Sequence, residues 1–65
     1  MIVRVGDVIK FRRGHIGKIT MLSCGENSYP YLKVGGAYTL INALDTKDFE
    51  GAEILGNMYD GFQLP

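Results

Sequence analysis

The stretch YLKVGGAYTLI, residues 31–41, decides the fold, because it reads as two strands joined by a glycine pair. Gly-Gly between two alternating runs is typical of a two-residue hairpin turn, and a type I′ turn needs positive φ at both positions. A turn at Gly35-Gly36 also fixes the register of the strands. It pairs Val34 with Ala37, Lys33 with Tyr38, Leu32 with Thr39 and Tyr31 with Leu40.

The two faces of this hairpin differ in polarity. One face carries only uncharged side chains, those of Leu32, Val34, Ala37, Thr39 and Ile41. The opposite face carries Tyr31, Lys33, Tyr38 and Leu40. Since lysine is almost never fully buried without a partner, we predict that the uncharged face covers the core and that the other is half exposed.

Period-two alternation recurs outside the hairpin and predicts further strands in residues 7–13 and 15–22, with a last short strand over 52–55. The composition of residues 24–28 is that of a loop. Residues 45–49 begin with Asp45, which can cap one short helical turn, while Gly56-Asn57 is typical of a turn.

Together these elements predict an all-β fold, a small barrel of four to five strands with one short helical turn before the last strand. Closure of the barrel would remove the open sheet edges. We place the barrel in residues 1–55 and a C-terminal tail in residues 56–65. The tail carries Met58, Tyr59, Phe62 and Leu64, so it either packs on the barrel or is disordered.

Length and composition argue against an enzyme. With 65 residues, 46% of them hydrophobic and 22% charged, the chain is a small folded domain with little room for a deep substrate pocket. One cysteine and one histidine allow no internal disulfide and no zinc ligand set, and we expect no cofactor. Cys24 and His15 have no partners in a catalytic pattern.

The sequence predicts a cytoplasmic protein, a location that includes the cytoplasm of an infected host cell. The N-terminal residues lack the apolar run of a secretory leader, and an acid comes as early as Asp7. No stretch approaches the roughly 18 apolar residues of a membrane span. A single thiol fits a reducing compartment.

The charges are divided unevenly along a chain of zero net charge: residues 1–33 hold six cations and two acids, and residues 34–65 hold one cation and five acids. Either the halves complement each other within a small barrel, or they form a basic patch and an acidic edge. The five acids of residues 34–65 are either ordinary solvated charges or a mimic of nucleic-acid phosphates. They are Asp45, Asp48, Glu50, Glu53 and Asp60.

Two further groups are candidates for binding. The basic loop contains Lys10, Arg12, Arg13, His15 and Lys18, and it is either a solvated strand face or a phosphate-binding surface. The aromatic stripe contains Tyr29, Tyr31 and Tyr38, with Lys33 between them. Exposed tyrosines stack on bases or anchor protein interfaces, whereas covered ones only complete the barrel surface.

Two segments, VGDVIKF at residues 5–11 and GHIGKI at 14–19, resemble the opening of SH3-like barrels of the KOW type. The run LDTKDF at residues 44–49 resembles the helical turn before the final strand of SH3-like folds. In size and style the chain is also similar to small SH3-like proteins encoded by bacteriophages. The resemblance implies a binding role, with aromatic faces for protein partners or basic residues for RNA.

We therefore expect a small non-enzymatic binding module, a phage-encoded modulator of a host protein, without membrane contact. Its partner-binding residues would be Tyr31, Lys33 and Tyr38, flanked by Arg12, Arg13 and Lys18. The alternative is a KOW-like domain that binds RNA or DNA through the same residues. A third possibility is a homo-oligomer, since a marginal core favours self-association.

Overall fold

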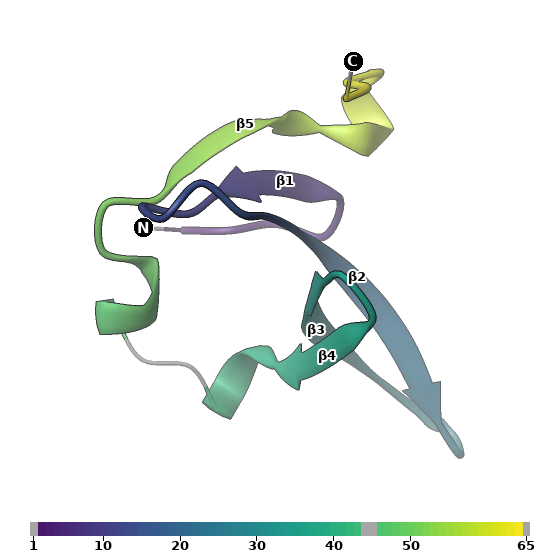
Figure 1. Ribbon diagram of the computed structural model, residues 1–65. Helices are drawn as coiled ribbons and strands as arrows, with labels where there is room; N and C mark the ends of the chain where they lie inside the picture. Colours follow the sequence, from purple (N-terminus) through teal and green to yellow (C-terminus); the bar gives the residue numbers. More distant parts are fainter. Residues whose placement is uncertain (1, 44–45, 65) are drawn as a thin grey trace.

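The structure is a computed structural model that describes residues 2–43 and 46–64, so the predicted cap Asp45 lies outside the described residues. Its strands are β1 (Asp7–Lys10), β2 (Ile16–Cys24), β3 (Asn27–Val34), β4 (Ala37–Leu40) and β5 (Glu53–Asn57). Three short 3-10 turns complete it: η1 (Ile41–Ala43), η2 (Thr46–Phe49) and η3 (Met58–Asp60). The predicted all-β class is confirmed, and η2 provides the predicted helical turn before the last strand (Figure 1).

All five strands form one antiparallel sheet in the order β4-β3-β2-β1-β5. The predicted closure into a barrel is wrong, because within residues 2–43 and 46–64 no strand ladder joins β4 to β5. The chain leaves β4 after Leu40 and enters η1 at once. Ile41, Phe49 and Ala52, from the segment that connects β4 to β5, pack against the core.

The hairpin around the glycine pair has the predicted register. Val34 pairs with Ala37, Lys33 with Tyr38, Leu32 with Thr39 and Tyr31 with Leu40. The turn type differs from the prediction, since Gly35 has φ +58° but Gly36 has no positive φ. Positive φ at the first central position alone is the mark of a type II′ turn, which also suits the right-handed twist of a hairpin.

The buried core consists of Ile9, Phe11, Ile19 and Leu32, which come from β1 to β3 and the residue after β1. On the predicted core face of the hairpin, Val34 and Ile41 join this cluster, as expected. Ala37 and Thr39 do not, and both are exposed, because β4 is the outermost strand of the sheet. Two of the five residues of that predicted face are therefore solvent-facing.

A long β2–β3 hairpin replaces the predicted loop at residues 24–28. The strands extend to Cys24 and from Asn27, and they leave only Gly25 and Glu26 as the turn. Continuous cross-strand pairing thus outweighs the loop-like composition. The hairpin projects beyond the rest of the sheet (Figure 1). Pro30 lies in this projecting part of β3, where it pairs with β2. The β3–β4 ladder ends at the Tyr31–Leu40 pair, so the missing N–H of Pro30 interrupts no bond to β4.

The C-terminal segment, residues 58–64, turns back over the sheet. Gly56 and Asn57 belong to β5, where the sequence predicted a turn, and the chain turns at η3 instead. Phe62 packs directly on Gly56, where an added Cβ would lie 2.5 Å from the ring. The backbone N–H of Phe62 also donates to the carbonyl of Asn57 at 3.1 Å.

Ile9 is the most deeply buried side chain of the described chain, with no exposed surface, and its truncation tests the core. We expect Ile9→Ala to lower the free energy of unfolding by about 2–5 kcal/mol, through lost burial and the cavity left behind. Because a domain of this size has only about 3–5 kcal/mol, this loss removes a large part or all of its stability at 25 °C. Urea titration followed by circular dichroism measures this, and Ile2→Ala, at a 91% exposed position, should match wild type. Equal midpoints for both variants would contradict the assigned core.

Candidate functional site

One row of residues crosses the sheet on the face opposite the core. Gly56 of β5 pairs with Val8, Val8 with Lys18, Lys18 with Lys33, and Lys33 with Tyr38 of β4. Because side chains alternate along a strand, this row lies on the other side of the sheet from Ile9 and Leu32. We call this side the outer face.

The outer face brings most of the predicted binding residues together. Tyr29, Tyr31 and Lys33 occupy alternate positions of β3, so they share this face. The ammonium of Lys33 lies 5.6 Å from the centroid of the Tyr38 ring, within the range of a cation–π contact. Tyr29 and Tyr38 are exposed, whereas Tyr31 and Lys33 are half-buried. With Lys18 beside Lys33, the face combines aromatic and cationic groups.

Arg12 and Arg13 lie apart from that row, in the turn between β1 and β2. They line a separate cavity of about 490 Å³, here called the loop groove, together with Lys47, Asp48 and Glu50. The stem of Arg12 packs beside Gly51, where an added Cβ would lie 3.2 Å from the carbons of that stem. The loop groove therefore mixes both signs of charge, and the structure does not join these arginines to the outer face.

His15 lies in the same turn and has a packing contact. Its ring stacks on Phe11, with centroids 4.9 Å apart and ring planes 16° apart. Its carbonyl accepts a hydrogen bond from the backbone N–H of Phe11 at 2.9 Å. Both contacts hold the turn that follows β1.

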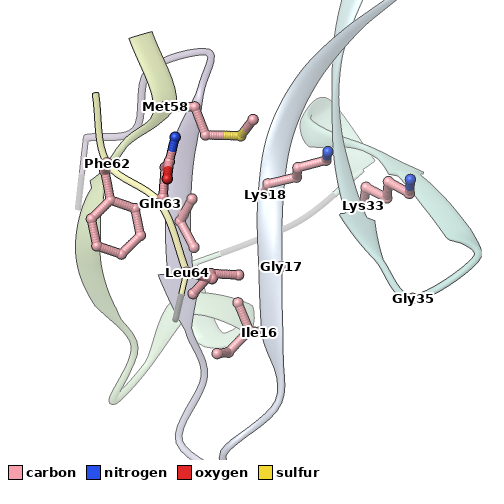
Figure 2. A pocket seen from close by; sticks show the side chains of 10 residues that line it. Ile16, Gly17, Lys18, Lys33, Gly35, Met58, Phe62, Gln63 and Leu64 are labelled. Atoms are coloured by element: carbon pink, nitrogen blue, oxygen red, sulfur yellow. The ribbon is translucent and has the colours of Figure 1, made fainter. Parts of the chain in front are cut away.

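A groove of about 410 Å³ opens on the outer face beside the C-terminal segment, and we call it the tail groove. Its apolar lining comes from Val8, Ile16, Met58, Phe62 and Leu64. Its polar lining includes Lys18, Lys33 and Gln63. Figure 2 shows the C-terminal segment on one side of the groove and the two lysines on the other.

Sequence reasoning identified the lysines of this groove but not its other wall. The signal for that wall was the set of apolar residues in the predicted tail, Met58, Phe62 and Leu64. That signal predicted packing on the sheet, one of the two alternatives for the tail, without saying where. The position follows from Gly56, which admits the Phe62 ring against β5.

A buried polar pair at the edge of the sheet positions this C-terminal wall. Asp7 and Asn57 are 2% and 6% exposed, and Nδ2 of Asn57 donates to Oδ1 of Asp7 at 2.8 Å. The same Nδ2 donates to the carbonyl of Val5 at 3.0 Å, and Oδ1 of Asn57 accepts from the N–H of Tyr59 at 2.8 Å. The second carboxylate oxygen of Asp7 accepts from the N–H of Arg4 at 2.6 Å.

Opposing effects act on the pKa of the Asp7 carboxyl. Burial raises the pKa, since it disfavours the charged form, but hydrogen bonds from the Arg4 amide and from Asn57, together with the charge of Arg4, outweigh it. The net pKa lies below its ordinary value of 3.8. Asp7 is therefore a charged acceptor at neutral pH, fully satisfied by donors.

The described residues show neither a metal site nor a membrane span. Within 2–43 and 46–64, no three His, Cys, Asp or Glu side chains come together as a ligand group. In the same part of the chain, no helical segment has the length and apolar character needed to cross a bilayer. The chemistry available on the outer face is thus that of aromatic rings, ammonium groups and apolar surface.

The lowered pKa of Asp7 predicts a pH dependence of stability. A carboxyl whose pKa is lower in the folded state stabilises the fold fully above its unfolded pKa, near 3.8. That contribution is lost as pH falls from there through the folded pKa. We expect Asp7→Asn to lower the free energy of unfolding by about 1–3 kcal/mol at pH 7, because one buried donor loses its acceptor. The variant should also show a smaller decline in stability between pH 5 and pH 2 than wild type.

Urea midpoints measured across this pH range test the prediction. Asp60→Asn is the matched control, since Asp60 forms an exposed pair with Arg4 at 3.1 Å that should contribute little. An Asp7→Asn variant with the stability and acid slope of wild type would show that the buried pair is not a stabilising contact.

Comparisons of the chain with protein-family models, with curated protein sequences and with solved structures found no match.

Proposed function

We propose that this protein is a non-enzymatic binding module that holds a protein partner on its outer face. The observation that carries the proposal is the contiguous placement of Lys18, Lys33, Tyr38 and Tyr31 across β2, β3 and β4. Tyrosine is enriched among the residues that dominate binding energy at protein interfaces, because it buries a large rigid ring and keeps a polar end. Tyr38 fits this description, because its ring is exposed and the ammonium of Lys33 lies over it.

The mechanism is steric and needs no chemical step. A paired sheet holds the backbone that carries these rings and ammonium groups in place, so no backbone has to be ordered when a partner binds. A standard interface buries about 800 Å² on each partner. The exposed surface of this chain is 4786 Å², so such a contact would occupy roughly a sixth of it.

An SH3-like family assignment is part of the proposal. It is supported by the 3-10 turn that precedes β5, a feature that the resemblance in the sequence predicted. The open sheet departs from a closed barrel. That the protein is a bacteriophage-encoded modulator in the cytoplasm of a host cell stays a prediction from size and style.

A nucleic-acid partner is less well supported by the geometry than a protein partner. Phosphate binding needs several cations along one track, and base stacking needs rings beside them. Here Arg12 and Arg13 lie in the loop groove beside Asp48 and Glu50, away from the tyrosines of the outer face. The zero net charge also provides no general attraction to phosphates.

Affinity capture from bacterial lysate, followed by titration with the purified captured protein, tests the role of the outer face. We expect Tyr38→Ala and Tyr31→Ala each to weaken binding about tenfold or more, since truncation of an interface anchor removes its buried area. Thr39→Ala is the matched control, because Thr39 is exposed on the same strand but on the opposite face. Unchanged affinity in both tyrosine variants would remove the outer face from the proposal.

A salt titration distinguishes the two classes of partner. We expect no binding to a labelled 20-nucleotide single strand or to a duplex in fluorescence polarisation, even at 20 mM salt. A protein that contacts several phosphates would instead bind at low salt and lose orders of magnitude in affinity at 200 mM. That second result would favour the KOW-like alternative over a protein partner.

A further inference from the structure

We infer that the tail groove binds a short acidic peptide segment that carries a large apolar side chain. The inference rests on the proposed function and names the chemistry of the partner. It starts from apolar surface that the fold leaves uncovered. Ile16, Met58 and Leu64 line the groove with 38%, 48% and 50% of their surfaces exposed. Exposed apolar side chains gathered in one concave place mark an interaction site.

The charges of the groove select the partner. The residues that line it include two lysines and no acid. Among the residues that the structure describes, no carboxylate lies within ion-pair distance of Lys18 or Lys33. The ammonium of Lys33 lies 5.6 Å from the centroid of the Tyr38 ring, so within the described part of the chain this cation has an aromatic ring beside it and no carboxylate. The groups of a partner that complement these lysines are carboxylates. The apolar lining of the groove favours an apolar side chain next to them.

The dimensions of the groove suit an extended segment. Its lining runs from Val8 on β1 across Lys18 on β2 to Lys33 on β3. Neighbouring strands lie about 4.8 Å apart, so the two lysine-bearing strands and β1 together span roughly 10 Å, or about three extended residues. One apolar side chain would pack between Ile16 and Leu64, while a carboxylate one or two residues away reaches the lysines (Figure 2).

A fluorescein-labelled peptide of sequence DDLFDD is the probe, measured by fluorescence polarisation. Two matched peptides separate the two requirements: KKLFKK reverses the charge, and DDGSDD removes the apolar side chains. We expect saturable binding of DDLFDD alone, weakened as NaCl rises from 50 to 500 mM because exposed ion pairs are screened. Binding of all three peptides with equal affinity, or of none, would overturn the inference.

Charge reversal places the binding in the groove. We expect Lys18→Glu and Lys33→Glu each to weaken DDLFDD about fivefold or more, since each replaces an attraction with a repulsion. Arg13→Glu is the matched charge reversal, because Arg13 is an exposed cation that lines the loop groove and not the tail groove. An equal loss in all three variants would overturn the inference, since it would show only a general charge effect.

A measurement on the wild-type protein covers the case in which a variant fails to fold. Amide chemical shifts recorded during titration with DDLFDD should change most at Ile16, Lys18, Lys33, Met58 and Leu64. Changes confined to the loop groove would overturn the inference. So would displacement of DDLFDD by a 20-nucleotide DNA strand at lower concentration, in favour of nucleic acid. If DDLFDD fails to bind while Tyr38→Ala still weakens a captured partner, the groove inference fails and the proposed function stands.

Discussion

The hydrogen bond between Asp7 and Asn57 is the contact on which the arrangement of the molecule depends. It joins residues 50 positions apart in the sequence, both almost fully buried, and it lies where β1 begins and β5 ends. Every other ladder of the sheet joins strands that follow one another in the chain. A buried carboxylate is costly unless donors satisfy it, and here the Arg4 amide and the Asn57 side chain do so. The pair therefore specifies which strand covers β1.

The same asparagine links the fold to the outer face. Its side-chain oxygen accepts from Tyr59 and its carbonyl from Phe62, so the C-terminal segment leaves β5 in a defined direction. That direction carries Phe62 over Gly56 and places Leu64 across from Lys18. The sheet thus has two different sides. One buries Ile9 and its neighbours, and the other combines the tyrosines and lysines with a wall from the end of the chain.

Sequence patterns predicted those features of the fold that residues close together in the chain determine. The Gly35-Gly36 pair was enough for the register of β3 and β4, and alternation was enough to put Tyr31, Lys33 and Tyr38 on one face. The true extent of β5 and the position of the tail groove depend on the contact of Asp7 with Asn57, residues that lie 50 positions apart in the sequence. The open sheet follows from the path of the chain, which leaves β4 directly for η1. Gly56-Asn57 has the composition of a turn, and only its pairing with Asp7 and Val8 makes it a strand. Arg12 and Arg13 lie in the turn after β1 and line the loop groove, a position that strand alternation does not determine.

The late position of β5 in the chain has a consequence for the nascent protein. The β1–β2, β2–β3 and β3–β4 hairpins form between neighbouring segments, on a timescale of about 1–10 μs. The strand that covers the other edge of β1 ends 17 residues after Leu40, the last residue of β4. Until that strand docks, the backbone of β1 is unpaired on that side and Asp7 lacks its donor from Asn57, so the partly folded chain presents an open strand edge to which another copy could pair.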